Sequence, residues 1–139
     1  MRQLIVVLLL ITSKGVCAQG GWEWELLPSM PEPVSNNSVV EAFAGDTLCV
    51  YSFTGISEGL EPADIHLKSW RYNTILGEWT QLPDVDDFQG KIAAGASTVN
   101  NIIYLIGGYH VFENFNEQTS DKVHRFDADA NVWLEDGAD

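Results

Sequence analysis

Cysteine is scarce in this chain of 139 residues, which contains only Cys17 and Cys49. Cys17 falls in a segment that we expect to be removed, so Cys49 has no partner for an internal disulfide. Because Cys49 lies in an apolar strand, we expect a buried structural thiol. One cysteine is also too few for a zinc or iron–sulfur framework, and the three histidines lack a spacing such as H-x-x-x-H. We therefore expect no metal site and no cofactor.

Basic residues are also scarce. The chain has 7 lysines and arginines against 20 aspartates and glutamates, which gives a net charge of −13. Nucleic acids and anionic membrane surfaces attract proteins of the opposite charge balance, so neither is an expected partner. Removal of residues 1–18 would take away Arg2 and Lys14 but no acidic residue. The remaining 5 basic and 20 acidic side chains would carry a net charge of −15, which suits a soluble exported protein.

The chain lacks a long apolar run. The longest one, Leu4 to Ile11, is shorter than the roughly 20 residues of a transmembrane helix, so we expect no membrane insertion. Arg2 gives this run a positive start, and Val16-Cys17-Ala18 resembles a cleavage site for signal peptidase. The pattern predicts cleavage between Ala18 and Gln19 and a secreted protein, either periplasmic or extracellular.

Two other interpretations of residues 1–18 stay open. The segment would be a buried N-terminal strand if it were retained. A lipid on Cys17 would instead anchor the protein to a membrane, although Lys14-Gly15-Val16 is a poor context for bacterial lipidation.

No stretch shows a sustained helical period, and no catalytic motif is evident. The chain lacks a G-x-S-x-G sequence, a glycine-rich loop for phosphate, and a pair of carboxylates that the sequence brings together. The sequence therefore does not indicate a reaction.

The most informative stretch runs from Ile92 to Trp133. Four short strands fit into it: a small-residue strand (Ala93–Val99), an apolar run typical of a strand buried on both faces (Ile102–Ile106), Val123–Phe126 and Val132–Leu134. Asn100-Asn101 favours a tight hairpin turn, and the glycine pair Gly107-Gly108 marks unusual backbone angles.

The same pattern occurs earlier in the chain. Asn36 to Phe53 aligns with the first half of this stretch at a constant offset of 55 residues. The second half repeats at an offset of 54, which matches Tyr72 with Phe126 and Trp79 with Trp133. A further partial copy, Trp24 to Pro28, resembles Trp79 to Pro83. A four-stranded unit that recurs near 50 residues predicts a β-propeller.

The repeat resembles the kelch motif, in which an apolar strand and a Gly-Gly pair precede an aromatic residue that lies seven residues before a tryptophan. Gly107, Gly108, Phe126 and Trp133 match this pattern, whereas the earlier copy keeps Tyr72 and Trp79 but has Ser52-Phe53 in place of the glycines. The resemblance implies an all-β fold of about two four-stranded blades plus one N-terminal strand. The first blade is then degenerate.

The expected organisation follows from these repeats. Residues 1–18 are a signal peptide, and residues 19–33 hold a strand (Trp22–Leu27) that closes the last blade, followed by a linker. Residues 34–83 and 84–139 form the first and second blades. Because propellers close with about four to eight blades, two blades predict the N-terminal fragment of a longer protein. If the chain instead ends at Asp139, closure by self-assembly is the alternative.

The loops between the second and third strands are the candidate binding sites that the kelch resemblance implies. They are Thr54 to Asp64, which is acidic, and Tyr109 to Asp121. Aromatic, amide and carboxylate side chains that suit a sugar or a protein surface gather in the second loop: Tyr109, His110, Phe112, Glu113, Asn114, Asn116 and Glu117. The alternative is a solvated loop whose aromatic rings pack on the blade. His66 and His124 fall on third strands, where we expect ordinary half-buried positions.

Two functions remain open. The first is a secreted propeller that binds a protein or glycan without catalysis. The second is a sugar-modifying enzyme, such as an epimerase or mutarotase for sialic acid, which the resemblance alone implies. A copper oxidase similar to galactose oxidase is a weaker alternative, because Cys49 and Tyr51 share a strand face without an evident set of copper ligands.

Overall fold

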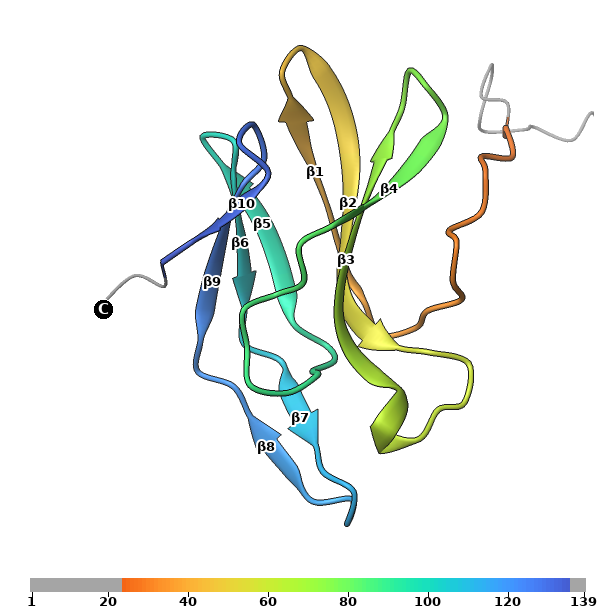
Figure 1. Ribbon diagram of the computed structural model, residues 1–139. Helices are drawn as coiled ribbons and strands as arrows, with labels where there is room; N and C mark the ends of the chain where they lie inside the picture. Colours follow the sequence, from red (N-terminus) through yellow and green to blue (C-terminus); the bar gives the residue numbers. More distant parts are fainter. Residues whose placement is uncertain (1–23, 136–139) are drawn as a thin grey trace, which may run out of the picture.

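The computed structural model describes residues 24–135, which form an all-β structure (Figure 1). The predicted signal peptide and its cleavage site lie outside these residues. The first sheet has the order β1-β2-β3-β4, and its strands are β1 (Ser38–Ala44), β2 (Thr47–Ile56), β3 (Ile65–Asn73) and β4 (Glu78–Leu82). The second has the order β10-β9-β6-β5, and its strands are β5 (Gly95–Val99), β6 (Ile102–Ile106), β9 (Val123–Asp127) and β10 (Val132–Leu134). All strand pairs are antiparallel.

The two sheets repeat one architecture, as the sequence predicts. The hairpin between β1 and β2 turns at Gly45, and the equivalent hairpin between β5 and β6 turns at Asn100 and Asn101, which have φ of 50° and 64°. Asparagine tolerates these angles better than most residues. Tyr72 lies opposite Trp79 in the first sheet, and Phe126 lies opposite Trp133 in the second.

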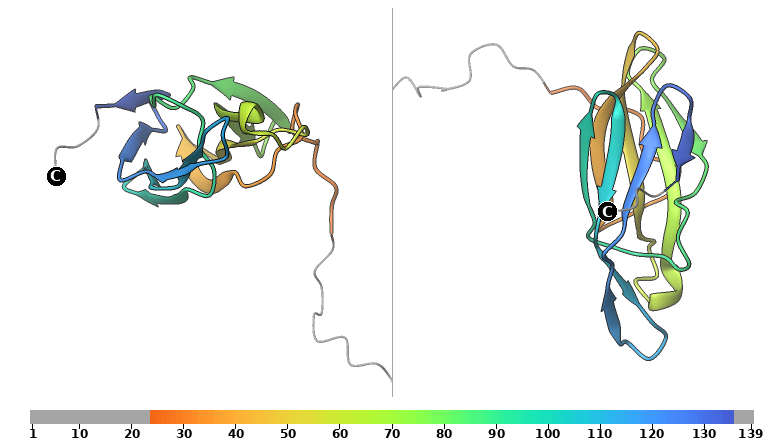
Figure 2. Two further views of the ribbon diagram at one scale, coloured as in Figure 1. Left: turned by 90° about the horizontal axis from the view of Figure 1, so that it is seen from below. Right: turned by 90° about the vertical axis from the view of Figure 1, so that its left-hand side faces the viewer.

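The core lies between the sheets, which face each other as two layers with β1 beside β5 (Figure 2). Phe53 from the first sheet packs edge-on against Phe126 and Trp133 of the second, with ring centroids 5.8 and 5.4 Å apart. Ile103 and Leu105 are fully buried in the same core. Cys49 is a free thiol with no exposed surface.

Polar contacts also join the two sheets. The side chain of Asn101 accepts a hydrogen bond from the Phe43 amide at 2.9 Å and donates one to the Phe43 carbonyl at 3.0 Å. Asn101, in a turn of the second sheet, is therefore hydrogen-bonded to the backbone of β1 in the first sheet. Arg71 donates from Nη1 to the side chain of Asn131 at 2.9 Å.

The two equivalent tryptophans of the repeat also make the same backbone contact. Trp79 Nε1 donates to the Pro28 carbonyl at 2.9 Å, and Trp133 Nε1 donates to the Pro83 carbonyl at 3.0 Å. Pro28 and Pro83 end the two similar segments Trp24–Pro28 and Trp79–Pro83. The segment before Pro28 therefore lies where the outer strand of a preceding blade would lie.

Three strand predictions differ from the structure. Residues 24–27 form no strand, because an extended segment needs a neighbouring strand to complete its hydrogen bonds, and Trp24 and Leu26 are almost fully exposed. The Ile102–Ile106 strand is buried on one face only, with Ile106 48% exposed. The small-residue strand begins at Gly95, because Ala93 has a left-handed φ of 55° that interrupts an extended conformation.

Both predicted loops contain regular structure. Strand β2 continues through Ile56 with a bulge at Thr54, and the remainder of that loop carries the short 3-10 helix η1 (Pro62–Asp64). The stretch after Gly108 forms a two-stranded ribbon of β7 (Tyr109–Val111) and β8 (Glu117–Thr119), which extends beyond the second sheet (Figure 1). The pairing of β7 with β8 satisfies the backbone N–H and C=O groups of this stretch. Its polar composition gave no indication of that pairing.

None of the helices within residues 24–135 is long and apolar enough to cross a membrane.

Candidate binding pocket

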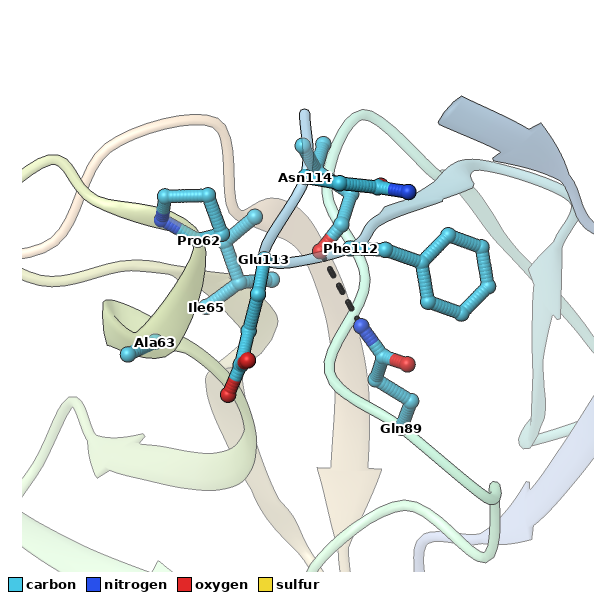
Figure 3. A pocket seen from close by; sticks show the side chains of 8 residues that line it. Pro62, Ala63, Ile65, Gln89, Phe112, Glu113 and Asn114 are labelled. Carbon is cyan, nitrogen blue, oxygen red and sulfur yellow. Dashed lines mark hydrogen bonds between the residues drawn. The ribbon is translucent and has the colours of Figure 1, made fainter. Parts of the chain in front are cut away.

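A pocket of about 620 Å³ lies where the two predicted loops approach each other (Figure 3). One wall comes from η1 and the start of β3, the second from the linker that joins the two sheets (residues 83–94), and the third from the β7–β8 hairpin. The lining residues are Pro62, Ala63, Ile65, Gln89, Val111, Phe112, Glu113 and Asn114. Loops that are far apart in sequence therefore form one site.

The η1 wall has a defined local structure. The Glu61 amide donates to Asp64 Oδ2 at 3.0 Å, and the Asp64 amide donates to the Glu61 carbonyl at 2.8 Å. A Cβ atom at Gly59 would lie 2.1 Å from Asp64 Oδ2, so a side chain there would displace this carboxylate from the Glu61 amide. These contacts hold Pro62 and Ala63 at the pocket.

The hairpin wall is closed at its tip by the backbone. The Phe112 amide donates to the Asn116 carbonyl at 2.9 Å, and the Phe115 amide donates to the Phe112 carbonyl at 2.7 Å. The Asn114 side chain accepts from the Asn116 amide at 3.0 Å. Gln89 Nε2 donates to the Val111 carbonyl at 3.0 Å, which joins the linker to the hairpin (Figure 3).

The pocket brings together three of the seven predicted binding residues, namely Phe112, Glu113 and Asn114. Asn116 and Glu117 are exposed on the same hairpin but do not line the pocket. Tyr109 exchanges two backbone hydrogen bonds with Ile92, both 3.0 Å long. His110 is 1% exposed and cannot reach a ligand in this structure, because its ring is held between the Gly90 carbonyl and the Phe88 ring.

The glycine pair shapes the start of the hairpin. Gly107 and Gly108 have φ of 64° and 86°. A Cβ atom at Gly108 would lie 2.7 Å from the Ile92 carbonyl oxygen, so a side chain there would displace the linker strand. The close approach of Ile92 to β7 therefore depends on this glycine.

A buried ionic cluster lies behind the pocket and is centred on Asp87. Its carboxylate, which has no exposed surface, is 3.1 Å from Lys91 Nζ and 3.1 Å from Lys122 Nζ. His124 Nε2 lies 3.2 Å from Asp87 Oδ2, and His110 Nε2 lies 4.0 Å from the same oxygen. The cluster joins the linker to β7 and β9, and Lys91, His110 and His124 are themselves buried.

The ionised form of Asp87 is stabilised despite its burial. Desolvation by itself would raise the pKa of this carboxyl group. Hydrogen bonds from Lys122, from the Phe88 amide at 2.8 Å and from Lys91 outweigh that effect and hold the pKa below its ordinary value. Asp87 therefore stays charged throughout the neutral and mildly acidic range.

The sequence did not predict this cluster, and it named the Thr54 to Asp64 loop as a candidate without singling out Pro62 or Ala63, which line the pocket. His124 was expected at a half-buried position, but it is 1% exposed because it packs against Asp87 and Trp133. Asp87 and Lys91 are four residues apart, which is the one local signal of an ion pair. Lys122 and His124 lie 35 and 37 residues from Asp87, and only the fold brings them together.

The pocket offers binding groups rather than metal ligands. Glu113 supplies a carboxylate, Gln89 and Asn114 supply amides, and Pro62, Ile65 and Phe112 supply apolar surface. Within residues 24–135, no three of the histidine, cysteine, aspartate and glutamate side chains are grouped to hold a metal ion. This arrangement can fix the orientation of a ligand that has both apolar and polar parts.

Comparison with known sequences identifies the repeat. The profile of the Kelch motif matches residues 93–135, which span β5 to β10. The chain is 29% identical over 114 residues to Kelch-like protein terF of Aspergillus terreus, a match that covers 80% of this chain and 23% of the relative. It is 26% identical over 125 residues to the N-(sulfonatooxy)prop-2-enimidothioate sulfolyase of Thlaspi arvense, which covers 81% of this chain and 36% of that enzyme.

A shorter match and a solved structure agree with these relatives. Kelch-like protein 31 of Danio rerio is 34% identical over 65 residues, which is 47% of this chain and 9% of the relative. The structure of YjhT superimposes with a TM-score of 0.57 and 20% sequence identity, over 78% of this chain and 28% of that chain. The chain thus spans between about a tenth and about a third of the length of these four proteins.

Proposed function

Because the chain folds into kelch-type propeller blades, we propose that it acts as an exported binding module that holds a protein or glycan ligand in the pocket between η1 and the β7–β8 hairpin. The pocket itself is the observation that carries this proposal. Loops on a rigid sheet scaffold commonly carry binding residues, and here two such loops converge.

The lining supports binding by both kinds of ligand. Phe112 provides an aromatic face, and Gln89 and Asn114 provide amides that can pair with hydroxyl or peptide groups. Gln89 Nε2 is already engaged by the Val111 carbonyl, so the wall is held in place before a ligand arrives. A preformed wall reduces the entropy cost of binding.

The substitution Ala63→Trp tests the pocket directly. Ala63 is exposed and lines the pocket, so a bulky side chain there should fill the space without entering the core. We expect binding to decrease by about tenfold or more, as measured by screening the full-length protein on arrays of glycans and peptides. Ala130→Trp is the matched control, because Ala130 is exposed in the distant β9–β10 turn. Ligands that bind the wild type and both variants equally would exclude the pocket as their site.

Export is part of the same proposal and rests on residues 1–18, which lie outside the described part of the chain. The intact mass of the native exported protein should correspond to an N-terminus at Gln19. Ala18→Arg should block cleavage, because signal peptidase requires a small residue at that position. An exported product that retains Met1 would contradict the signal peptide.

An enzymatic function is the second candidate, because one of the relatives is a sulfolyase by name. Of the lining residues, only Glu113 has an ionisable side chain, so it is the one candidate in the pocket for a proton-transfer role. For a sugar epimerase or mutarotase, NMR exchange spectroscopy would show faster interconversion of sialic acid anomers with the wild type than with Glu113→Gln. If a ligand binds but the wild type and Glu113→Gln give the same rate of anomer interconversion, the binding module is favoured.

A further inference from the structure

The charge of the pocket points to a cationic ligand. We propose that it receives a lysine or arginine side chain from an extended segment of a partner protein, with the cation at Glu113. This inference rests on the proposed function, because it names the ligand class of the same pocket. It also selects a basic protein segment over an acidic sugar as the ligand, a choice that the fold alone does not make.

The two loops that form the pocket are acidic and contain no lysine or arginine. Residues 57–64 carry three carboxylates, and so do residues 109–121: Glu58, Glu61, Asp64, Glu113, Glu117 and Asp121. Asp64 is partly occupied by the Glu61 amide, but its charge remains. The other carboxylates are exposed in the same two segments, so they add to the negative potential around the pocket.

The basic side chains within residues 24–135 are already engaged by this chain. Lys68 pairs with Glu32, Arg71 donates to Asn131, Lys91 and Lys122 surround Asp87, and Arg125 donates to the Glu135 carbonyl. None of the ion pairs within the described part of the chain includes Glu113. A partner would therefore supply the compensating charge.

The walls around Glu113 fit a long basic side chain. In Figure 3 the Glu113 side chain descends past Pro62 and Ile65, and in this view its carboxylate falls between Ala63 and Gln89, which line the same pocket. The apolar rings and methyl groups can cover the methylene stem of a lysine or arginine, while the carboxylate receives the charged end. Hydrogen bonds to a charged group are stronger than neutral ones, so this carboxylate would dominate selectivity.

An acidic sugar fits the same charges poorly. A carboxylate ligand such as sialic acid would approach Glu113 with a like charge, so Glu113 would repel it. A neutral sugar would not gain from the charge of the pocket. The electrostatics therefore favour the basic segment over either sugar.

The test compares short peptides that alternate alanine with lysine, glutamine or glutamate, together with N-acetylneuraminic acid. Fluorescence anisotropy with the full-length protein should show the lysine peptide binding about tenfold or more tighter than the glutamate peptide. Added salt should weaken this preference. Glu113→Gln should remove most of it. Glu117→Gln deletes an equal charge from the same hairpin outside the pocket, and it should change the dissociation constant by about twofold or less.

The outcomes separate this inference from the proposed function. If the lysine peptide failed to bind the wild type, or bound no better than the glutamate peptide, the cationic assignment would be wrong. Binding that survives Glu113→Gln but is abolished by Ala63→Trp would also reject the cationic ligand, while the pocket would stand. Binding that survives Ala63→Trp would instead reject the pocket itself.

Discussion

Replacing Trp133 with alanine is expected to lower the free energy of unfolding by about 3–5 kcal/mol. The indole ring packs against Phe53 of the other sheet at 5.4 Å and against Phe126 of its own sheet at 5.0 Å. It also donates from Nε1 to the Pro83 carbonyl at 3.0 Å. Truncation therefore leaves a cavity between the sheets and removes a hydrogen bond to the linker. Because domains are stable by only about 5–15 kcal/mol, the melting temperature should fall sharply.

Two variants define the origin of this effect. Trp133→Phe keeps a ring in the core but loses the indole donor, so it should cost about 1–2 kcal/mol. Trp79→Ala should cost less than Trp133→Ala, because Trp79 contacts the ring of Tyr72 at 5.1 Å and the Pro28 carbonyl but lies outside the core between the sheets. Thermal and chemical unfolding of the full-length protein would give all three values. Equal costs for both tryptophan-to-alanine changes would contradict the assigned role of Trp133 between the sheets.

Asp87→Asn is expected to destabilise the protein by about 3–5 kcal/mol, because it removes the carboxylate from a buried ionic cluster. Lys91 has no exposed surface and lies 3.1 Å from Asp87, and His124 lies 3.2 Å from it. Asparagine has nearly the same shape but carries no charge, so the buried Lys91 ammonium would lose the negative charge 3.1 Å from it. The matched control is Asp86→Asn, which removes an exposed charge from the neighbouring residue and should change stability by about 0.5 kcal/mol or less.

The same carboxylate predicts a pH dependence with a defined sign. The pKa of Asp87 is lower in the folded protein than in the unfolded chain, where an aspartate titrates near about 3.9. Below that pH the unfolded chain binds a proton that the folded protein still excludes, so acid favours unfolding. The stabilisation by Asp87 is therefore fully present above the unfolded pKa and is lost as the pH falls through the folded pKa.

The difference in unfolding free energy between the wild type and Asp87→Asn should follow this titration. It should shrink as the pH falls below about 4, where the unfolded chain begins to protonate Asp87. Denaturant titrations at several pH values would measure it. A difference that grows below pH of about 4 would show that the folded protein protonates Asp87 first and would reverse the assigned direction.

The repeat was predictable because it is encoded in local patterns. The turn residues Asn100 and Asn101 adopt the left-handed conformations that asparagine tolerates, and the offset between the two halves places Trp79 and Trp133 at equivalent positions. The strand over residues 24–27 was not found, because a strand depends on a hydrogen-bonding neighbour and local composition does not show whether one is present. The ribbon of β7 and β8 was missed because its polar residues lack the alternation of a half-buried strand.

The site was predictable only in part. Composition drew attention to both loops and thereby to Phe112, Glu113 and Asn114, which line the pocket. The same composition grouped His110 with them, although its ring is buried and faces the Asp87 cluster. Neighbouring residues on a strand point to opposite sides, so one stretch can serve both a pocket and a core.

The sequence by itself determined the all-β repeat, the acidic charge and the loops that carry polar and aromatic residues, because each of these properties resides in short-range patterns or in composition. Only the tertiary structure decided that η1 faces the β7–β8 hairpin, that Gln89 completes the wall between them, and that Asp87 gathers Lys91, Lys122 and His124. These contacts join residues 35 or more positions apart in several cases. Their formation depends on how two sheets pack face to face, and no local pattern specifies that packing.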